Sequence, residues 1–210
     1  MPNDQQISCL AEPRPWNKNR LVGQKRPLKS RDVWALRTRL ELSGNKRDLA
    51  LFNLAIDSKL RACDLVSLKV GDVRTADRIR ERTSIVQKKT GRPVHFELTE
   101  PTRLALIEWL SVGLCASAGY LFPSRTDNKR HLSTRQYARL VHKWIALSGL
   151  NGTSYGTHSM RRTKVVQIYR KTGNLRAIQL LLGHTKLETT VRYLGIEVED
   201  ALTMSEQLEI

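Results

Sequence analysis

Two short motifs of the sequence group cationic side chains that could bind a phosphate. His158 and Arg161 stand three residues apart in "HSMRR", at the start of an expected helix, so both can point from one face. Arginine grips phosphate oxygens with two parallel hydrogen bonds, and histidine can donate to phosphate or move a proton near neutral pH. Arg61 opens "RACDL" after an apolar run and could be a rigidly held phosphate ligand. The alternatives are a solvated basic turn for the first motif and an ion pair of Arg61 with Asp57 or Asp64 for the second.

A third motif, "LLGHTKLETTVRYLG", supplies a candidate nucleophile. His184 precedes Tyr193 by nine residues, and Thr185 and Glu188 between them match a T-x-x-E capping box. The box predicts that a helix starts at this point and carries Tyr193. The alternative interpretation is a short amphipathic helix in which the tyrosine is only an aromatic anchor.

A pair of lysines offers a proton donor. Lys88 and Lys89 lie in "QKKTG", between two short β-like runs that predict a hairpin. Lysines at a hairpin tip are commonly solvated and guard the sheet edge. A flexible lysine can also reach a bound nucleic-acid backbone and protonate a departing oxygen.

Together these residue types suit one reaction. A phenol can attack a DNA phosphodiester and become covalently joined to the phosphate. Several cations around the phosphate can stabilise the developing charge, so the reaction needs no metal or other cofactor. Because the phosphotyrosine bond conserves the energy of the broken linkage, religation needs no ATP. The candidate site residues are Arg61, one of Lys88 and Lys89, His158, Arg161, His184 and Tyr193.

The overall charge points to the same kind of partner. The 210 residues include 36 Lys and Arg against 20 Asp and Glu, which gives a formal net charge of +16. Such a balance predicts binding to a polyanion, most often nucleic acid. Three scattered cysteines without zinc spacing indicate neither a disulfide framework nor structural zinc. A signal peptide and a long apolar run are absent from the sequence, so we expect a cytoplasmic, nucleoid-associated protein without a membrane partner.

The periodicity of the sequence predicts the elements that must position these side chains. The fold class is mainly α with one small antiparallel β-sheet, or α+β. Ser30 is the expected cap of the first helix, and residues 61–73 read as one short helix. The expected helices cover residues 30–43, 47–60, 61–73, 100–112, 133–148, 157–172, 174–182 and 185–194, and the expected hairpin covers 82–98.

The two ends of the chain differ in character. Residues 1–27 hold four of the seven prolines and are expected to form an extended basic arm, followed by one domain over residues 28–210. Residues 197–210 carry five carboxylate side chains and no Lys or Arg. We expect this acidic segment to form a helix that either folds back on its own domain or docks on a neighbouring protomer.

The ordered motifs resemble the tyrosine recombinase (phage integrase) family. "RACDLVSLKVGDV" resembles the first box of that family, "HSMRRTK" its H-x-x-R box, and "LLGHTKLETTVRYL" its final box with the family spacing from His to Tyr. The resemblance covers roughly residues 29–200. It implies a mainly α catalytic domain whose small sheet carries the lysine. It also implies strand exchange between two double-stranded DNA sites by a homotetramer, through a Holliday junction.

The resemblance also implies roles for the residues. Tyr193 is then the nucleophile, Arg61 and Arg161 hold the scissile phosphate, and Lys89 rather than Lys88 is the general acid. His158 is a phosphate ligand and proton shuttle, and His184 donates a hydrogen bond to the phosphate. The resemblance adds accessory DNA-bending proteins as further candidate partners.

Two departures from the family pattern are visible. Family members commonly carry a separate N-terminal helical domain, whereas here only about 28 residues precede the first expected helix. This resembles the compact recombinases that invert fimbrial promoter switches. Arg162 stands where many members have a second histidine. Two rival functions stay open: relaxation of DNA by a type IB topoisomerase, and DNA binding by a non-catalytic accessory protein.

Overall fold

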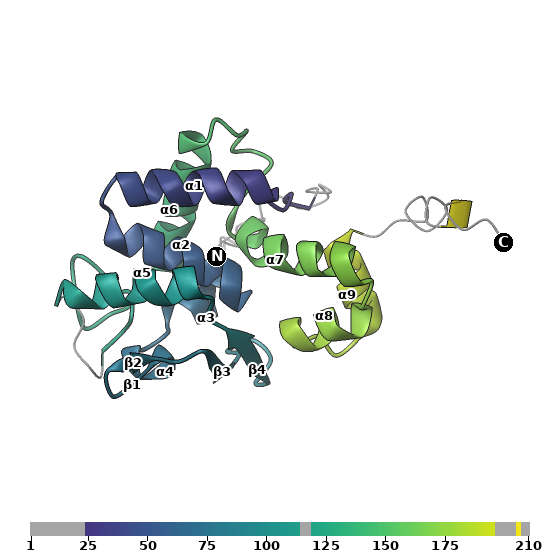
Figure 1. Cartoon of the computed structure of the whole chain (residues 1–210). Coiled ribbons are helices and arrows are strands. Elements are labelled where there is room, and N and C mark those ends of the chain that lie inside the picture. Colours follow the sequence, from purple (N-terminus) through teal and green to yellow (C-terminus); the bar gives the residue numbers. More distant parts are fainter. Residues whose placement is uncertain (1–23, 114–118, 196–204, 207–210) are drawn as a thin grey trace, which may run out of the picture.

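The computed structural model describes residues 24–113, 119–195 and 205–206 (Figure 1). The fold is mainly α with small antiparallel sheets, as the periodicity predicts. The helices are α1 (Ser30–Leu42), α2 (Lys46–Ser58), α3 (Ala62–Val66), α4 (Val70–Val73), α5 (Glu100–Ser111), α6 (Thr134–Leu147), α7 (Thr157–Thr172), α8 (Leu175–Leu182) and α9 (Leu187–Leu194). The strands are β1 (Arg74–Thr75), β2 (Arg78–Ile79), β3 (Arg82–Val86) and β4 (Pro93–Glu97).

Helix α2 is the centre of the larger hydrophobic core. From Asp48 to Ser58 every residue of α2 is buried, because α1, α5 and α7 pack around it. The side chain of Asn45 accepts a hydrogen bond from the Asp48 backbone and starts the helix. Phe52 meets Trp144 of α6 edge to face, with ring centroids 5.7 Å apart. The buried residues of this core run from Leu28 to Met160.

Strands β3 and β4 form the predicted hairpin. Their antiparallel register pairs Thr83 with Phe96 and Ile85 with Val94, and these side chains face the core, whereas those of Ser84 and His95 face outward. The prediction of a single sheet was incomplete, because β1 and β2 form a second two-stranded ribbon. The hairpin turn places its lysines next to α3.

The C-terminal helices form a smaller unit. Figure 1 shows α8 and α9 lying together at the far end of α7, beyond the body that α1, α2, α5 and α6 form. A second hydrophobic cluster holds them to α7, and its buried members are Val165, Val166, Ile178, Leu182 and Leu194. We call α8, α9 and their connection the α8–α9 unit.

Three local predictions were wrong. Ser30 is the first residue of α1 rather than its cap; Lys29 is the cap residue, and its backbone N–H donates to Asp32. Residues 61–73 form two short helices, α3 and α4. Thr185 does not cap α9, which begins two residues later at Leu187.

The structure describes only parts of the two chain ends. Of the expected basic arm, residues 24–27 are described, and the remainder lies outside the described residues. Of the expected C-terminal helix, residues 205 and 206 alone are described, and both are helical. The arm and the docking helix therefore stay predictions.

Candidate active site

Four of the predicted site residues line one cavity. Arg61 is the N-cap residue of α3, Lys89 lies in the hairpin turn, and His158 and Arg161 lie in the first turns of α7. Their cavity has a volume of about 330 Å³. We call it the cationic cavity, and its lining residues are Leu60, Arg61, Ala62, Cys63, Lys89, Thr134, Thr157, His158 and Arg161.

A buried hydrogen-bond chain joins the two arginines of the cavity. Nη1 of Arg61 donates to Oε1 of Gln87 at 2.6 Å, and Nε2 of Gln87 donates to the Leu182 carbonyl at 3.2 Å. Nη2 of Arg161 donates to the same carbonyl at 3.0 Å. Gln87 is 1% exposed, so the chain is shielded from water. Both guanidinium groups are thus oriented before any phosphate arrives.

The contacts of Arg61 settle its alternative interpretation. Within the described ranges, no carboxylate forms an ion pair with Arg61: Asp57 pairs with Lys164, and Asp64 accepts a hydrogen bond from the Lys88 backbone at 2.9 Å. The expected alternative, an ion pair with Asp57 or Asp64, is therefore wrong for this structure. Its charge is left available for an anionic ligand.

Gly183 permits the close approach on which this chain of bonds depends. It ends α8 with a φ of +67°, in the left-handed region that favours glycine. A Cβ atom at this position would lie 2.6 Å from Cγ1 of Val94 and 3.3 Å from Oε1 of Gln87. A side chain there would push α8 away from the hairpin and pull the Leu182 carbonyl off both of its donors.

A second, partly buried network holds the elements that carry the cavity. Nζ of Lys59 contacts Oε2 of Glu97 at 2.9 Å, and Nζ of Lys164 contacts Asp57 at 2.7 Å and Glu97 at 2.5 Å. Lys59 lies two residues before Arg61, Glu97 lies on β4, and Lys164 lies on α7. The network therefore links three elements that position site residues. Neither this network nor Gln87 could be predicted from the sequence, because no local pattern marks these pairs.

Burial and opposite charges set the ionisation of this network. Burial raises the pKa of Asp57, but Lys164 and the hydroxyl groups of Thr102 and Thr99 outweigh it and lower the pKa overall. Burial lowers the pKa of Lys59 despite the attraction of Glu97. The network keeps its carboxylates charged because each has a cation within hydrogen-bond distance.

Both predicted histidines are shifted toward the neutral form. Burial lowers the pKa of His158, and the surrounding Arg161, Arg162, Arg61 and Lys89 lower it further. Burial, with Arg161 and Arg61, lowers the pKa of His184 to about 4. Each is therefore uncharged near pH 7 and offers one donor and one acceptor nitrogen.

Tyr193 lies beside the cationic cavity but does not line it. The edge of His184 meets its ring at a centroid distance of 5.5 Å, and the guanidinium carbons of Arg161 and Arg162 lie 5.6 and 5.5 Å from the ring centroid. The hydroxyl is buried and has no hydrogen-bond partner in the described structure. Burial raises the pKa of Tyr193 to about 12. The phenol is close to the cations but withdrawn from the cavity.

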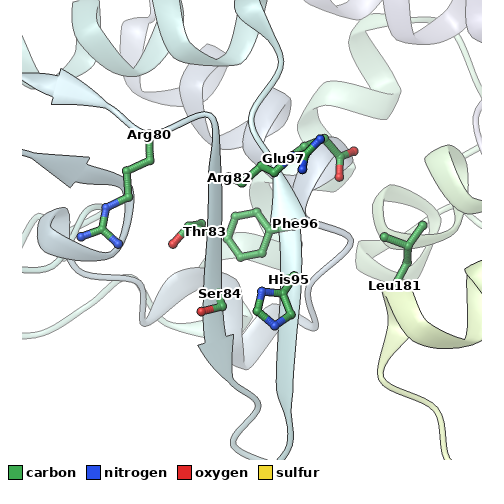
Figure 2. Close-up of a pocket in the computed structure, with 8 residues that line it drawn as sticks. All are labelled: Arg80, Arg82, Thr83, Ser84, His95, Phe96, Glu97 and Leu181. Carbon is green, nitrogen blue, oxygen red and sulfur yellow. The ribbon is translucent and has the colours of Figure 1, made fainter.

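A larger hollow lies elsewhere, over the hairpin. It has a volume of about 640 Å³ and is bounded by both strands and by Leu181 of α8 (Figure 2). Arg80, Arg82 and His95 line it, and none of the six predicted site residues does. Its open, basic character suits contact with a nucleic-acid backbone better than enclosure of a small molecule.

The described residues contain neither a metal-binding cluster nor a membrane-spanning helix. Among them, no group of three or more His, Cys, Asp or Glu side chains could hold a metal ion. None of their helices is long and apolar enough to cross a membrane. Cys63 is a free thiol at the wall of the cationic cavity.

Comparison with known families identifies the family of the chain. The model of the phage integrase family matches residues 26–199. The chain belongs to the phage integrase family. This integrase-family chain is 30% identical over 156 residues to "Probable integrase/recombinase YoeC" of Bacillus subtilis, covering 74% of this chain and 81% of that protein. It is 32% identical over 154 residues to "Tyrosine recombinase XerC" of Neisseria meningitidis serogroup C, covering 73% and 48%.

Solved structures share the fold of this integrase-family chain. The crystal structure of XerA recombinase superposes with a TM-score of 0.71 at 21% identity, over 88% of this chain and 65% of that one. XerH recombinase in a post-cleavage complex with difH substrate gives a TM-score of 0.69 at 21% identity, over 88% and 54%. The chain thus spans about half the length of the XerC and XerH relatives. The finer resemblance to fimbrial-switch recombinases stays a prediction.

Proposed function

We propose that this chain is a site-specific DNA recombinase that cuts and rejoins DNA through a 3′-phosphotyrosine intermediate. One observation carries the proposal: four cationic or proton-carrying side chains converge on one cavity, and a tyrosine packs against one of its arginines. The residues are Arg61, Lys89, His158 and Arg161 in the cavity, with His184 and Tyr193 beside Arg161.

The cavity is suited to hold the scissile phosphate. Arg61 and Arg161 would each bind non-bridging oxygens, and their positions are already set by Gln87 and the Leu182 carbonyl. In the transition state extra negative charge develops on these oxygens. Fixed guanidinium groups therefore stabilise the transition state more than the ground state. Neutral His158 and His184 can donate hydrogen bonds without adding to the crowding of positive charge.

The proposed residues supply both proton transfers that the covalent step needs. The Tyr193 oxygen forms a bond to phosphorus as the bond from phosphorus to the 5′-oxygen breaks. His158 accepts the phenolic proton, directly or through water, and Lys89 donates a proton to the departing 5′-oxygen. The reverse attack by a 5′-hydroxyl on the phosphotyrosine rejoins a strand. No net oxidation or hydrolysis occurs.

The withdrawn phenol requires one movement before cleavage. Because the Tyr193 hydroxyl is buried and does not line the cavity, α9 or its end must shift to bring the oxygen to phosphorus. Gly195 directly after α9 has a φ of +69° and leaves the helix end free of a side chain. The proposed enzyme is therefore assembled for phosphate binding before it is assembled for attack.

A nicked suicide substrate tests the proposal. When the cleaved strand ends a few nucleotides after the scissile phosphate, the short fragment diffuses away and traps the covalent adduct. The wild-type chain should accumulate an SDS-resistant protein–DNA adduct, and Tyr193→Phe should lose it completely while retaining DNA binding. The matched control is Tyr169→Phe, a partly buried tyrosine of α7. An adduct that persists in Tyr193→Phe would exclude Tyr193 as the nucleophile.

The same assay separates the rival functions. A non-catalytic DNA-binding protein would form no adduct at all. A type IB topoisomerase would form the adduct and relax supercoils but would not exchange strands between two sites. Recombinant products from two-site plasmids, together with the adduct, would favour the recombinase and support a homotetramer on two double-stranded DNA sites.

We infer that DNA binding extends beyond the cavity. Residues 74–92 carry seven Arg or Lys side chains and two carboxylates, and the hollow of Figure 2 lies in this region. Residues 1–27 add the basic arm expected from the sequence. Each phosphate contact steepens the dependence of log affinity on log salt by about 0.9. Deleting residues 1–23 should flatten that slope if the arm touches DNA.

A further inference from the structure

The described segment before α1 lies along α7 and reaches α9. The backbone N–H of Arg26 donates to the Ser154 carbonyl at 2.9 Å, and the backbone N–H of Leu28 donates to the Thr163 hydroxyl at 3.0 Å. The Leu28 side chain is 2% exposed and belongs to the large core. We call residues 24–28 the strap. Its C-terminal end is thus fixed to the body of the protein.

The other end of the strap is joined to the helix that carries Tyr193. Nε2 of Gln24 donates to the Arg192 carbonyl, near the end of α9, at 2.5 Å. A Cβ atom added to Gly195 would lie 3.3 Å from Nη2 of Arg162 and 3.7 Å from Oε1 of Gln24. The strap, Arg162 and the end of α9 therefore form one packed junction.

Arg162 is the centre of this junction. Its Nη1 donates to the Lys25 carbonyl at 2.9 Å, and its guanidinium carbon lies 5.5 Å from the centroid of the Tyr193 ring. Arg162 is 6% exposed, and its Nε atom has no hydrogen-bond partner in the described structure. A guanidinium that binds a backbone carbonyl and also covers an aromatic face couples the positions of the two groups.

We propose that Gln24 and Arg162 are positioning residues that hold Tyr193 in its withdrawn place, so that displacement of the strap releases the nucleophile. The proposal rests on the proposed function only in taking Tyr193 as the nucleophile. The geometry favours withdrawal because the same packing that joins strap to α9 leaves the phenolic oxygen buried and outside the cationic cavity. Any interaction that pulls on residues 24 and 25 acts on α9 through the Gln24–Arg192 hydrogen bond, and on Arg162, which packs on the Tyr193 ring, through the Lys25 carbonyl.

The first test measures access to Tyr193 and does not depend on DNA cleavage. Gln24→Ala and Arg162→Lys are treated with tetranitromethane at pH 8, and nitration of the Tyr193 peptide is followed by mass spectrometry. Loss of one hydrogen bond should raise the nitration rate about five-fold. The matched control is Arg26→Ala, an exposed strap residue whose bond to the Ser154 carbonyl is made by its backbone and survives the substitution. Gln24 is exposed, so its truncation leaves the core intact.

The second test measures the consequence for cleavage. At saturating protein, single-turnover cleavage of the suicide substrate by Gln24→Ala should accelerate by a similar factor, since fewer molecules hold the phenol withdrawn. Equal nitration of Gln24→Ala, Arg162→Lys and Arg26→Ala would overturn the proposal. Faster nitration of Gln24→Ala with slower cleavage would also overturn it, because the junction would then hold the reactive position. Absence of an adduct from the wild type would refute the proposed function and leave the nitration result to decide the strap.

Discussion

The residues proposed to bind the phosphate and the tyrosine proposed as nucleophile stand on different hydrophobic cores. Arg61 and the first turns of α7 rest on the large core around α2, which includes Leu60 and Met160. Tyr193 packs on the small cluster of α7, α8 and α9, whose buried members number five. Both regions share α7, so Arg161 lies at their boundary. The two halves of the candidate site therefore differ in how firmly the fold holds them.

The two halves of the candidate site need different physical properties. Cations that stabilise a transition state work best when they are oriented in advance, and a large core with buried hydrogen bonds does this. A nucleophile that must approach phosphorus needs an element that shifts at low cost. Elements with few buried apolar contacts open locally at a fraction of the global free energy of unfolding. The α8–α9 unit fits that description.

The largest expected effect comes from substituting Arg161, which lies at the boundary between the two cores. Arg161→Ala should reduce single-turnover cleavage by about a hundred- to a thousand-fold, because it removes a fixed charge from the phosphate and a tie to the Leu182 carbonyl. Arg61→Ala should lose a comparable factor, since it also removes a fixed phosphate charge. Arg170→Ala, at the exposed far end of α7, is the control and should lose little. Cleavage rates of Arg161→Ala and Arg170→Ala that agree would show that the cationic cavity does not hold the phosphate.

Removing the proposed proton donor should have the next largest effect. Lys89→Ala should slow cleavage by about a hundred-fold, because the 5′-oxygen then leaves unprotonated. A substrate with sulfur at the 5′-bridging position has a better leaving group and should restore the rate. Lys88→Ala is the matched control, and its backbone contact with Asp64 survives the substitution. If sulfur rescues Lys88→Ala and fails to rescue Lys89→Ala, the two lysines exchange roles.

Matched truncations in the two cores test the comparison of stability directly. Leu51 and Ile178 are both fully buried, the first in the large core and the second in the small cluster. Leu51→Ala should lower the global free energy of unfolding by about 2–5 kcal/mol. Ile178→Ala should lower it less, and should instead speed amide exchange in residues 175–194. Urea unfolding and hydrogen-exchange mass spectrometry measure both effects, and uniform exchange in both variants would abolish the distinction.

The smallest expected effect is a pH dependence of the α8–α9 unit. The folded pKa of His184 is lowered to about 4, so between pH 6.5 and 4 the unfolded chain binds more protons than the folded chain. The free energy of unfolding should therefore fall as pH drops through this window. His158 has a lowered pKa as well and acts in the same direction.

A variant separates the contribution of His184. His184→Gln should flatten the fall in stability by about 1 kcal/mol, less than the full shift implies because solvent screens this partly exposed ring. His142→Gln, on the exposed face of α6, is the control and should retain the wild-type slope. If His184→Gln keeps the wild-type dependence of unfolding free energy on pH, folding does not lower the pKa of His184. Chemical unfolding at a series of pH values provides the measurement.

Much of the fold and of the site could be predicted from the sequence. Apolar periodicity located the helices, and alternation around "QKKTG" located the hairpin. These signals are local: each follows from which face of one element must be buried. The spacing of His158 and Arg161, and of His184 and Tyr193, likewise lies within single motifs. Residue types in order therefore identified the family chemistry before any contact was known.

One error arose where packing between two neighbouring helices competes with a local capping signal. Thr185 looked like a helix cap, but its carbonyl accepts a hydrogen bond from the buried Gln179 side chain, and the His184 backbone N–H donates to the Gln179 carbonyl. Residues 184–185 are therefore bound to α8, and α9 begins only at Leu187. Packing within the α8–α9 unit therefore overrides the local capping pattern.

The sequence by itself determined the residue types, their order and the helical faces that bear them, because these depend on neighbours within a few positions. Only the tertiary structure decided that Gln87 would orient Arg61, that Gly183 would let α8 approach the hairpin, and that Gln24 would reach the Arg192 carbonyl. It also decided that the Tyr193 hydroxyl is buried and its pKa raised. Burial and hydrogen bonding between segments up to 168 residues apart depend on the packing of the whole chain, which no local pattern encodes.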